Sequence, residues 1–151
     1  MDVAKARLIS HEMRSTVIGP QSPARILVVD DHLEVRTTIR HLLDWHGYQV
    51  CGEAKDGKEA IEQVVELEPD LVLLDINMPD MNGIQAALEI RRFTPETKIV
   101  FFTIYESPAL INSLRSFAHG FVSKSAAGTE LIPVVSRLAG PGAANWLNTT
   151  Q

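Results

Sequence analysis

The chain contains a single cysteine, Cys51, among its 151 residues, which excludes an intramolecular disulfide. Cys51 lies in an alternating apolar run with Tyr48 and Val50, a setting that favours a small core side chain over a reactive thiol. No stretch approaches the roughly 20 apolar residues of a membrane span, and residues 1–22 hold no apolar run of signal-peptide length. These absences predict a cytoplasmic protein without a membrane partner.

Basic residues are also few, at 14 Lys and Arg against 19 Asp and Glu, which gives a formal net charge of −5. Nucleic-acid binding depends on clustered Lys and Arg, so direct DNA binding by this chain is not predicted. No GxGxxG or P-loop motif indicates a nucleotide site. The histidines lack metal-ligand spacing, and we expect surface or helix-cap roles for all of them: His11, His32, His41, His46 and His119.

The chain is long enough for one well-packed core but too short for two. Residues 1–22 carry scattered charges and end near Gly19 and Pro20, so we expect a flexible N-terminal extension there. Residues 23–140 are predicted to form one domain, and residues 141–151 a C-terminal tail.

Short apolar runs alternate with segments of helical periodicity from Arg25 onward. Strands are predicted at Ile26–Val29, Tyr48–Ala54, Leu71–Leu74, Ile99–Phe102 and Phe121–Val122. The helical faces are predicted to carry Val35, Ile39, Leu42, Leu43 and His46, then Ile61, Val64 and Val65, then Ile84, Ala87 and Leu88, then Leu110, Leu114 and Phe117, then Leu131, Val134, Val135 and Leu138. Five such βα units favour an α/β fold, a doubly wound five-stranded parallel sheet of order 2-1-3-4-5 with five helices.

Polar side chains stand where the predicted strands end. Asp30 and Asp31 follow the first strand, Asp75 ends the third, Thr103 ends the fourth, and Lys124 comes just after the fifth. In open α/β sheets, ligands bind at this edge, where the strand order reverses. The first and third strands are neighbours in the predicted order, so we expect the acidic side chains to converge, flanked by Thr103 and Lys124.

Three carboxylates in one crevice repel one another unless a cation lies among them. Oxygen ligands without His or Cys suit Mg²⁺, which takes one or two carboxylates together with a phosphoryl oxygen. Lys124 supplies a compact positive charge for that phosphoryl group, and Thr103 supplies a hydroxyl donor. The crevice is therefore predicted to accept phosphate on a carboxylate.

The motifs ILVVDD, LLDINMPDMNG, FFT and GFVSK occur in order between Arg25 and about Gly140. In sequence and spacing this set resembles the receiver domains of bacterial two-component response regulators. The stretch Ser136–Leu147 further resembles receivers that lead into a LuxR-type DNA-binding domain.

The resemblance implies that Asp75 is the phospho-acceptor and that Asp30, Asp31, Asp75 and Asn77 form the metal site. Within it, Asp31, Asp75 and the backbone carbonyl of Asn77 would hold Mg²⁺. It also implies that Lys124 contacts the phosphoryl group and that Thr103 and Phe121 act as the switch pair. The implied partners are a sensor histidine kinase or phosphotransfer protein and, after phosphorylation, a second copy of the chain.

Three features depart from the common pattern of these receivers. Ile104 stands where a small residue is usual, so access to the phosphorylation pocket is in question. Pro133 lies in the last helical pattern, where Thr129 as N-cap would place it in the first turn. About eleven residues follow Gly140, far fewer than a helix-turn-helix module needs.

Two functional hypotheses therefore stay open. In one, the chain is a stand-alone signalling module that acts by protein contact or as a phosphate sink. In the other, it is the regulatory half of a DNA-binding transcriptional regulator whose output half is missing from this chain. An enzyme is not predicted: aspartyl-phosphate hydrolases carry a second acid two positions after the nucleophile, and here that position is Asn77.

Overall fold

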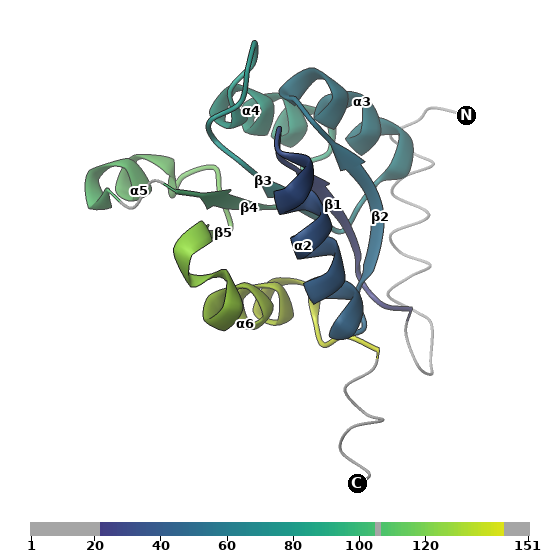
Figure 1. Ribbon diagram of the computed structural model, residues 1–151. Helices are drawn as coiled ribbons and strands as arrows, with labels where there is room; N and C mark the ends of the chain where they lie inside the picture. The colour runs from purple at the N-terminus through teal and green to yellow at the C-terminus, as the bar shows by residue number, and fades with distance from the viewer. Residues whose placement is uncertain (1–21, 105–106, 144–151) are drawn as a thin grey trace, which may run out of the picture.

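The computed structural model describes residues 22–104 and 107–143, and within them the chain alternates strands and helices (Figure 1). The elements are β1 (Arg25–Val29), α2 (Leu33–Trp45), β2 (Gln49–Ala54), α3 (Gly57–Leu67), β3 (Leu71–Leu74), α4 (Gly83–Phe93), β4 (Lys98–Thr103), α5 (Pro108–Leu114), β5 (Gly120–Ser123), the 3₁₀ turn η1 (Lys124–Ala126) and α6 (Ala127–Ala139). All paired strands run parallel, in the order β2-β1-β3-β4-β5. The predicted fold class and strand order are confirmed.

Two hydrophobic clusters cover the two faces of the sheet, because successive strand residues point to opposite sides. On one face, Leu27, Val72 and Phe101 pack with residues of α3, α4 and α5. On the other face, Val28 and Phe102 belong to a cluster that includes residues of α2 and α6. The four residues of β3 are all buried, which explains why its sequence is apolar throughout rather than alternating.

The starts of α3 and α4 are fixed by side chains that accept backbone hydrogen bonds. Asp56 caps α3 by accepting from the N–H of Glu59. Asn82 and Gln85 form a reciprocal capping box at the start of α4. These caps set where the chain enters α3 after β2 and α4 after β3.

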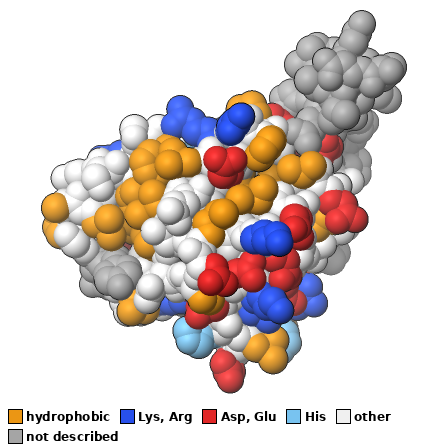
Figure 2. Space-filling model, turned by 90° about the horizontal axis from the view of Figure 1, so that it is seen from above, with side chains coloured by type: hydrophobic (Ala, Val, Ile, Leu, Met, Phe, Trp, Pro, Cys, Tyr) orange, Lys and Arg blue, Asp and Glu red, His pale blue; other side chains and the backbone are white. Residues whose placement is uncertain are grey.

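Two predicted helix faces need correction at single residues. Val65 of α3 is 43% exposed and Leu88 of α4 is 50% exposed, although both were expected to face the core. The predicted Val64 and Ala87 are buried, and Ala60 in α3 and Ala86 and Ile90 in α4 are buried with them. Small alanines face the sheet because α3 and α4 also pack against each other, which turns the larger side chains outward. Figure 2 shows hydrophobic side chains lying among charged ones on the face seen from above.

The start of the last helix also differs from the prediction. Helix α6 begins at Ala127 and follows η1 directly, so Thr129 lies inside it and does not cap it. Its hydroxyl donates to the backbone oxygen of Ala126 instead. Pro133 is consequently in the helix interior, where its ring nitrogen has no hydrogen to donate to the preceding turn. It stands on the exposed side of α6, while Leu131 and Val135 face the core.

After α6, the chain folds back onto the corner between α2 and β2. The hydroxyl of Tyr48 donates to the backbone oxygen of Gly140 at 2.7 Å, and the N–H of Ala143 donates to the backbone oxygen of Gly47 at 2.9 Å. A Cβ on Gly142 would lie 1.8 Å from the backbone oxygen of His46, so only glycine fits there. Except for Ser22, the predicted extension 1–22 lies outside the described residues, as do positions 144–151 of the predicted tail.

Among the described residues, every helix is too short or too polar to span a lipid bilayer.

Candidate functional site

The carboxyl ends of the two central strands place Asp30 beside Asp75. Val29 and Leu74, the residues just before them, are register partners in the β1–β3 pair. The N–H of Asp75 donates to the backbone oxygen of Val29 at 3.0 Å. Both aspartates are buried, with relative exposures of 1% and 3%. The convergence expected from the strand order is therefore present.

Lys124 bridges these two carboxylates from the end of β5. Its Nζ lies 2.5 Å from Asp30 Oδ2 and 3.3 Å from Asp75 Oδ2. The Lys124 side chain is only 16% exposed, and its ammonium also lies 5.8 Å from the centroid of the Phe102 ring. A compact cation held at this point attracts an anionic group that approaches Asp75.

Asp31 and His32 complete the acidic side of the site. His32 Nδ1 lies 3.1 Å from Asp31 Oδ1 and 3.3 Å from Asp30 Oδ1. One side-chain atom from each of Asp30, Asp31 and His32 lies within 4.8 Å of the others, an arrangement able to hold a metal ion. The sequence analysis missed His32 as a member of the site, although its position directly after the acidic pair was the available signal.

The electrostatics of the pocket favour a bound cation. Burial raises the pKa of the Asp75 carboxyl above its ordinary value, the nearby charge of Asp30 raises it further, and Lys124 opposes both. Burial lowers the pKa of Lys124, but its contacts with Asp30 and Asp75 outweigh that effect, so its pKa is raised on balance. Three carboxylates facing one ammonium leave a formal surplus of two negative charges, which a divalent cation neutralises.

The oxygen atoms of the pocket also fit a hard cation. Within the described part of the chain, Asp31 Oδ1 is shielded from solvent and accepts no hydrogen bond, and its near neighbour is the imidazole Nδ1 of His32. Asp30 Oδ2 is likewise shielded, and its contact is the ion pair with Lys124. Carboxylate oxygens are the protein ligands that suit Mg²⁺, and these oxygens are not taken up by hydrogen-bond donors. The donor set is thus suited to Mg²⁺.

The loop after β3 presents Asp75 to the pocket. The N–H of Asn77 donates to Asp75 Oδ1 at 3.3 Å, and the N–H of Gly83 donates to the backbone oxygen of Ile76 at 2.8 Å. Asp80 at the tip of the loop has a positive φ of 66°, a left-handed turn that aspartate tolerates. The loop is therefore closed on itself while the Asp75 side chain stays at the sheet edge.

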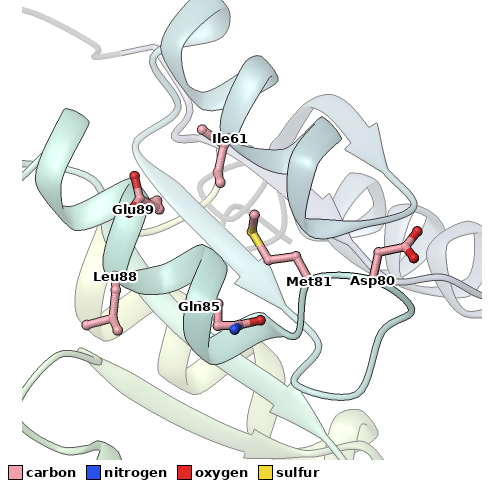
Figure 3. A pocket seen from close by; sticks show the side chains of 6 residues that line it. All are labelled: Ile61, Asp80, Met81, Gln85, Leu88 and Glu89. Carbon is pink, nitrogen blue, oxygen red and sulfur yellow. The ribbon is translucent and has the colours of Figure 1, made fainter.

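A separate groove lies on the outer side of the same loop (Figure 3). Its lining comes from α3, the loop and α4: Ile61, Asp80, Met81, Gln85, Leu88 and Glu89. None of the pocket aspartates lines it, so the groove is distinct from the acidic site.

Thr103 and Phe121 lie on the neighbouring strands β4 and β5. Thr103 is register partner of Ser123, and Phe121 is register partner of Phe101. Side chains two residues apart point to the same face, so Thr103 and Phe121 share one face diagonally. Thr103 is fully buried, and the half-buried ring of Phe121 lies 5.6 Å from that of Phe101. Ile104, directly after Thr103, is 66% exposed.

The remaining predictions on single side chains have mixed outcomes. Cys51 is half-buried, and burial raises the pKa of its thiol, which disfavours the reactive thiolate. His46 stands at the C-cap of α2 and His41 is exposed, as expected. His119 is exposed but also accepts a hydrogen bond from the N–H of Ile99 through Nδ1. His11 lies outside the described residues.

A doubly wound sheet with a buried carboxylate, an acidic pair and a lysine at its switch point defines a class of protein: a signalling domain that accepts a phosphoryl group. The family model described as "Response regulator receiver domain" matches residues 26–136. The chain therefore belongs to the response regulator receiver domain family of two-component systems.

Individual proteins agree with this assignment. The chain is 34% identical over 116 residues to the chemotaxis protein CheY of Thermotoga maritima, covering 76% of this chain and 97% of that protein. It is 40% identical over 113 residues to the response regulator GacA of Pseudomonas viridiflava, covering 74% of this chain but 53% of GacA. A solved LuxR-family response regulator from Aurantimonas superposes with a TM-score of 0.72 at 34% identity, covering 85% of this chain and 94% of that one.

Proposed function

We propose that Asp75 is the phospho-acceptor of this receiver domain and that Asp31, Asp75 and the Asn77 carbonyl bind Mg²⁺, with Asp30 beside them. The observation that carries the proposal is the contact of Lys124 Nζ with the carboxylates of both Asp30 and Asp75. Asp75 lies opposite Asp30 at the sheet edge and within reach of that lysine, a position suited to receiving an anionic group.

The transfer consists of one displacement at phosphorus. A carboxylate oxygen of Asp75 forms a bond to phosphorus as the bond from phosphorus to the donor's nitrogen or oxygen breaks. Lys124 is placed to attract the phosphoryl oxygens, and its ammonium keeps part of the negative charge of the pocket balanced. Bound Mg²⁺ supplies further charge neutralisation for the phosphoryl oxygens. Because the acceptor is the protein itself, we infer a phospho-acceptor switch and not an enzyme acting on external phosphoesters.

The signal leaves the pocket through Thr103 and Phe121 in this proposal. A phosphoryl group on Asp75 offers oxygens to which the Thr103 hydroxyl donates, and drawing that side chain inward vacates space for the Phe121 ring. Both residues lie on the two strands next to α5 and α6. The surface formed by α5, β5 and α6 is therefore the proposed contact surface for a partner.

The proposed donor is a sensor histidine kinase or a phosphotransfer protein, and the proposed setting is the cytoplasm. The output is open between two functions. One is a stand-alone module that acts by protein contact, and the other is the regulatory half of a DNA-binding transcriptional regulator. The chain spans nearly the whole length of the chemotaxis protein CheY and about half the length of the response regulator GacA. For either function we propose self-association after phosphorylation and no sequence-specific DNA binding by residues 1–151 alone.

Incubation with Mg²⁺ and acetyl phosphate tests the acceptor. The wild-type protein should gain one phosphoryl group that is stable in acid and released by hydroxylamine, as measured by intact-protein mass spectrometry. Asp75→Asn should gain none, because its amide is not nucleophilic. Asp80→Asn, an exposed carboxylate in the same loop, serves as the matched control and should be phosphorylated like wild type. Full labelling of Asp75→Asn would refute the assignment.

A further inference from the structure

We propose that Arg36 is a positioning residue for Mg²⁺ binding, acting on Asp31 through the peptide bond between Asp30 and Asp31. This inference rests on the proposed function, since it concerns the metal of the same site. Arg36 itself is not assigned a contact with the metal or with the phosphoryl group. It acts through the backbone that carries the acidic pair.

The Arg36 side chain connects three parts of the fold. From α2, its Nη1 donates to the backbone oxygen of Asp30 at 2.7 Å, and its Nε donates to Glu53 Oε1 on β2 at 3.2 Å. The side chain is only 14% exposed. The planar guanidinium holds its donors in a fixed fork, so one side chain makes both hydrogen bonds at once.

The contact with the Asp30 carbonyl is important because other groups already fix the rest of Asp30. Its N–H donates to Ala54, its Oδ1 accepts from the N–H of His32, and its Oδ2 is paired with Lys124. The carbonyl that Arg36 binds belongs to the peptide that leads into Asp31. Fixing this carbonyl fixes the orientation of that peptide and with it the direction in which the Asp31 side chain leaves the backbone.

Asp31 needs such support from its backbone. Its Oδ1 lies 3.1 Å from His32 Nδ1 but accepts no hydrogen bond within the described residues, and the His32 side chain is itself 63% exposed. A metal ligand that is not held in place by its own hydrogen bonds loses affinity when its backbone is free to turn. The acidic pair therefore depends on Arg36 mainly through Asp31.

Glu53 keeps Arg36 in place and balances its charge. Its second carboxylate oxygen, Oε2, lies 3.2 Å from Arg40 Nη2, and its backbone oxygen accepts from Gln63 Nε2 of α3 at 2.6 Å. The ion pair with Glu53 offsets the positive charge of Arg36 near the metal site. Arg36 therefore contributes orientation to the site with little added repulsion toward a cation.

Arg40 provides a matched control because it contacts the same glutamate from the same helix. It pairs with Glu53 Oε2, whereas the donor to the Asp30 carbonyl is Arg36. If Arg36 only fastened α2 to β2, Arg36→Lys and Arg40→Lys would have similar effects. Both substitutions preserve the charge, but the single ammonium of lysine cannot reproduce the fork that spans Glu53 and the Asp30 carbonyl.

The experiment measures Mg²⁺ binding to the unphosphorylated full chain by calorimetry, for wild type, Arg36→Lys and Arg40→Lys. We expect the Kd for Mg²⁺ to rise by about tenfold or more in Arg36→Lys, the usual effect of losing an outer-shell partner. Arg40→Lys should stay close to wild type. The phosphorylation rate of Arg36→Lys with acetyl phosphate should recover toward wild type at saturating Mg²⁺, because the acceptor and Lys124 are unchanged.

A second readout needs no metal. Amide chemical shifts of Asp31 and His32 in metal-free protein should change in Arg36→Lys more than in Arg40→Lys, and urea unfolding corrects for any difference in stability. Glu53→Gln, which keeps the side-chain shape, should weaken Mg²⁺ binding in the same direction and provides the test if Arg36→Lys does not fold. Equal Mg²⁺ affinity in wild type, Arg36→Lys and Glu53→Gln would overturn the inference while leaving the proposed function intact. Failure of wild type itself to bind Mg²⁺ would overturn both.

Discussion

At the scale of single residues, Gly83 determines how closely the loop after β3 packs. It is the first residue of α4, and its N–H closes the loop by donating to Ile76. A Cβ built on Gly83 would lie 2.0 Å from the backbone oxygen of Asp75 and 2.8 Å from the Cα of Ile76. Backbone atoms cannot move aside as a flexible side chain can, so a larger residue must displace the backbone of Asp75.

Gly83→Ala should therefore destabilise the fold by about 3 kcal/mol, the upper part of the usual range for overpacking. It should also slow phosphorylation, since the Asp75 backbone has to shift. Gly128→Ala is the control: its Cβ would meet nothing within 4 Å and it lies in α6, so the variant should be about 0.5 kcal/mol more stable. Urea unfolding gives both values, and equal stability of the two variants would contradict the close contact.

Ile104 is a second residue that we expect to affect the pocket, by limiting access to Asp75. It directly follows the buried Thr103 and is 66% exposed, so its side chain stands at the surface end of β4. We expect Ile104→Ala to speed both phosphorylation by acetyl phosphate and loss of the phosphoryl group to water, by a few-fold each. Rates unchanged in both directions would mean that the side chain lies away from the path to Asp75.

At the scale of elements, His119 connects the segment before β5 to the start of β4. The backbone N–H of His119 donates to the backbone oxygen of Ile99 at 2.8 Å, and the ring Nδ1 of His119 accepts from the backbone N–H of Ile99 at 3.0 Å. Only the neutral imidazole, with its proton on Nε2, can accept at Nδ1. Burial lowers the pKa of His119, and the charges of Lys98 and Arg91 lower it further.

The lowered pKa of His119 determines how the stability of the fold changes with pH. The imidazole takes up a proton more readily in the unfolded chain, so its contribution to stability is complete above the ordinary pKa of 6.5 and falls as the pH drops through it. His119→Asn, whose Oδ1 accepts without titrating, should lose less stability between pH 7.5 and pH 5 than wild type. His41→Asn, an exposed control on α2, should follow wild type. Urea unfolding at both pH values checks the difference, and parallel losses in wild type and His119→Asn would contradict it.

At the scale of the whole molecule, the layers of the fold determine which helices lie next to the strands that carry Thr103 and Phe121. Helices α2 and α6 cover one face of the sheet, and α3, α4 and α5 cover the other (Figure 1). Strands β4 and β5 lie at one side of the sheet; in chain order α5 connects them, and α6 follows β5 after η1. We therefore expect a change at Thr103 to reach helices on both faces through these two strands.

Beryllofluoride with Mg²⁺, standing in for the phosphoryl group, should shift amide signals across residues 103–138 and promote self-association. The physical requirement is two states that differ by only a few kcal/mol, so that one added group inverts their populations. Thr103→Ala should still accept phosphate yet lose most of the response, because the hydroxyl that follows the new oxygens is gone. Amide spectra and sedimentation provide the measurement. A full response in Thr103→Ala would remove the switch roles of Thr103 and Phe121 together.

Much of this architecture is encoded locally and was predictable from the sequence. The apolar run Leu71–Leu74 fits a strand buried on both faces, and it matches β3 residue for residue. Each of Asp30, Asp75 and Lys124 follows a strand, and parallel strands bring their carboxyl ends to one edge of the sheet. These sequence positions together with the predicted strand order were therefore enough to predict that the three side chains meet.

Contacts between elements were decided only by the tertiary structure. The exposure of Val65 and Leu88 depends on how α3 and α4 pack against each other, and η1 moved the start of α6 away from Thr129. The fork of Arg36 joins Asp30 to Glu53, which lies 17 residues after Arg36 in the chain. Periodicity shows which face of a helix is apolar, but the rotation of that helix against its neighbours depends on the side chains of all of them. That is why the strands and the acidic cluster followed from the sequence, while the partners of His32 and Arg36 did not.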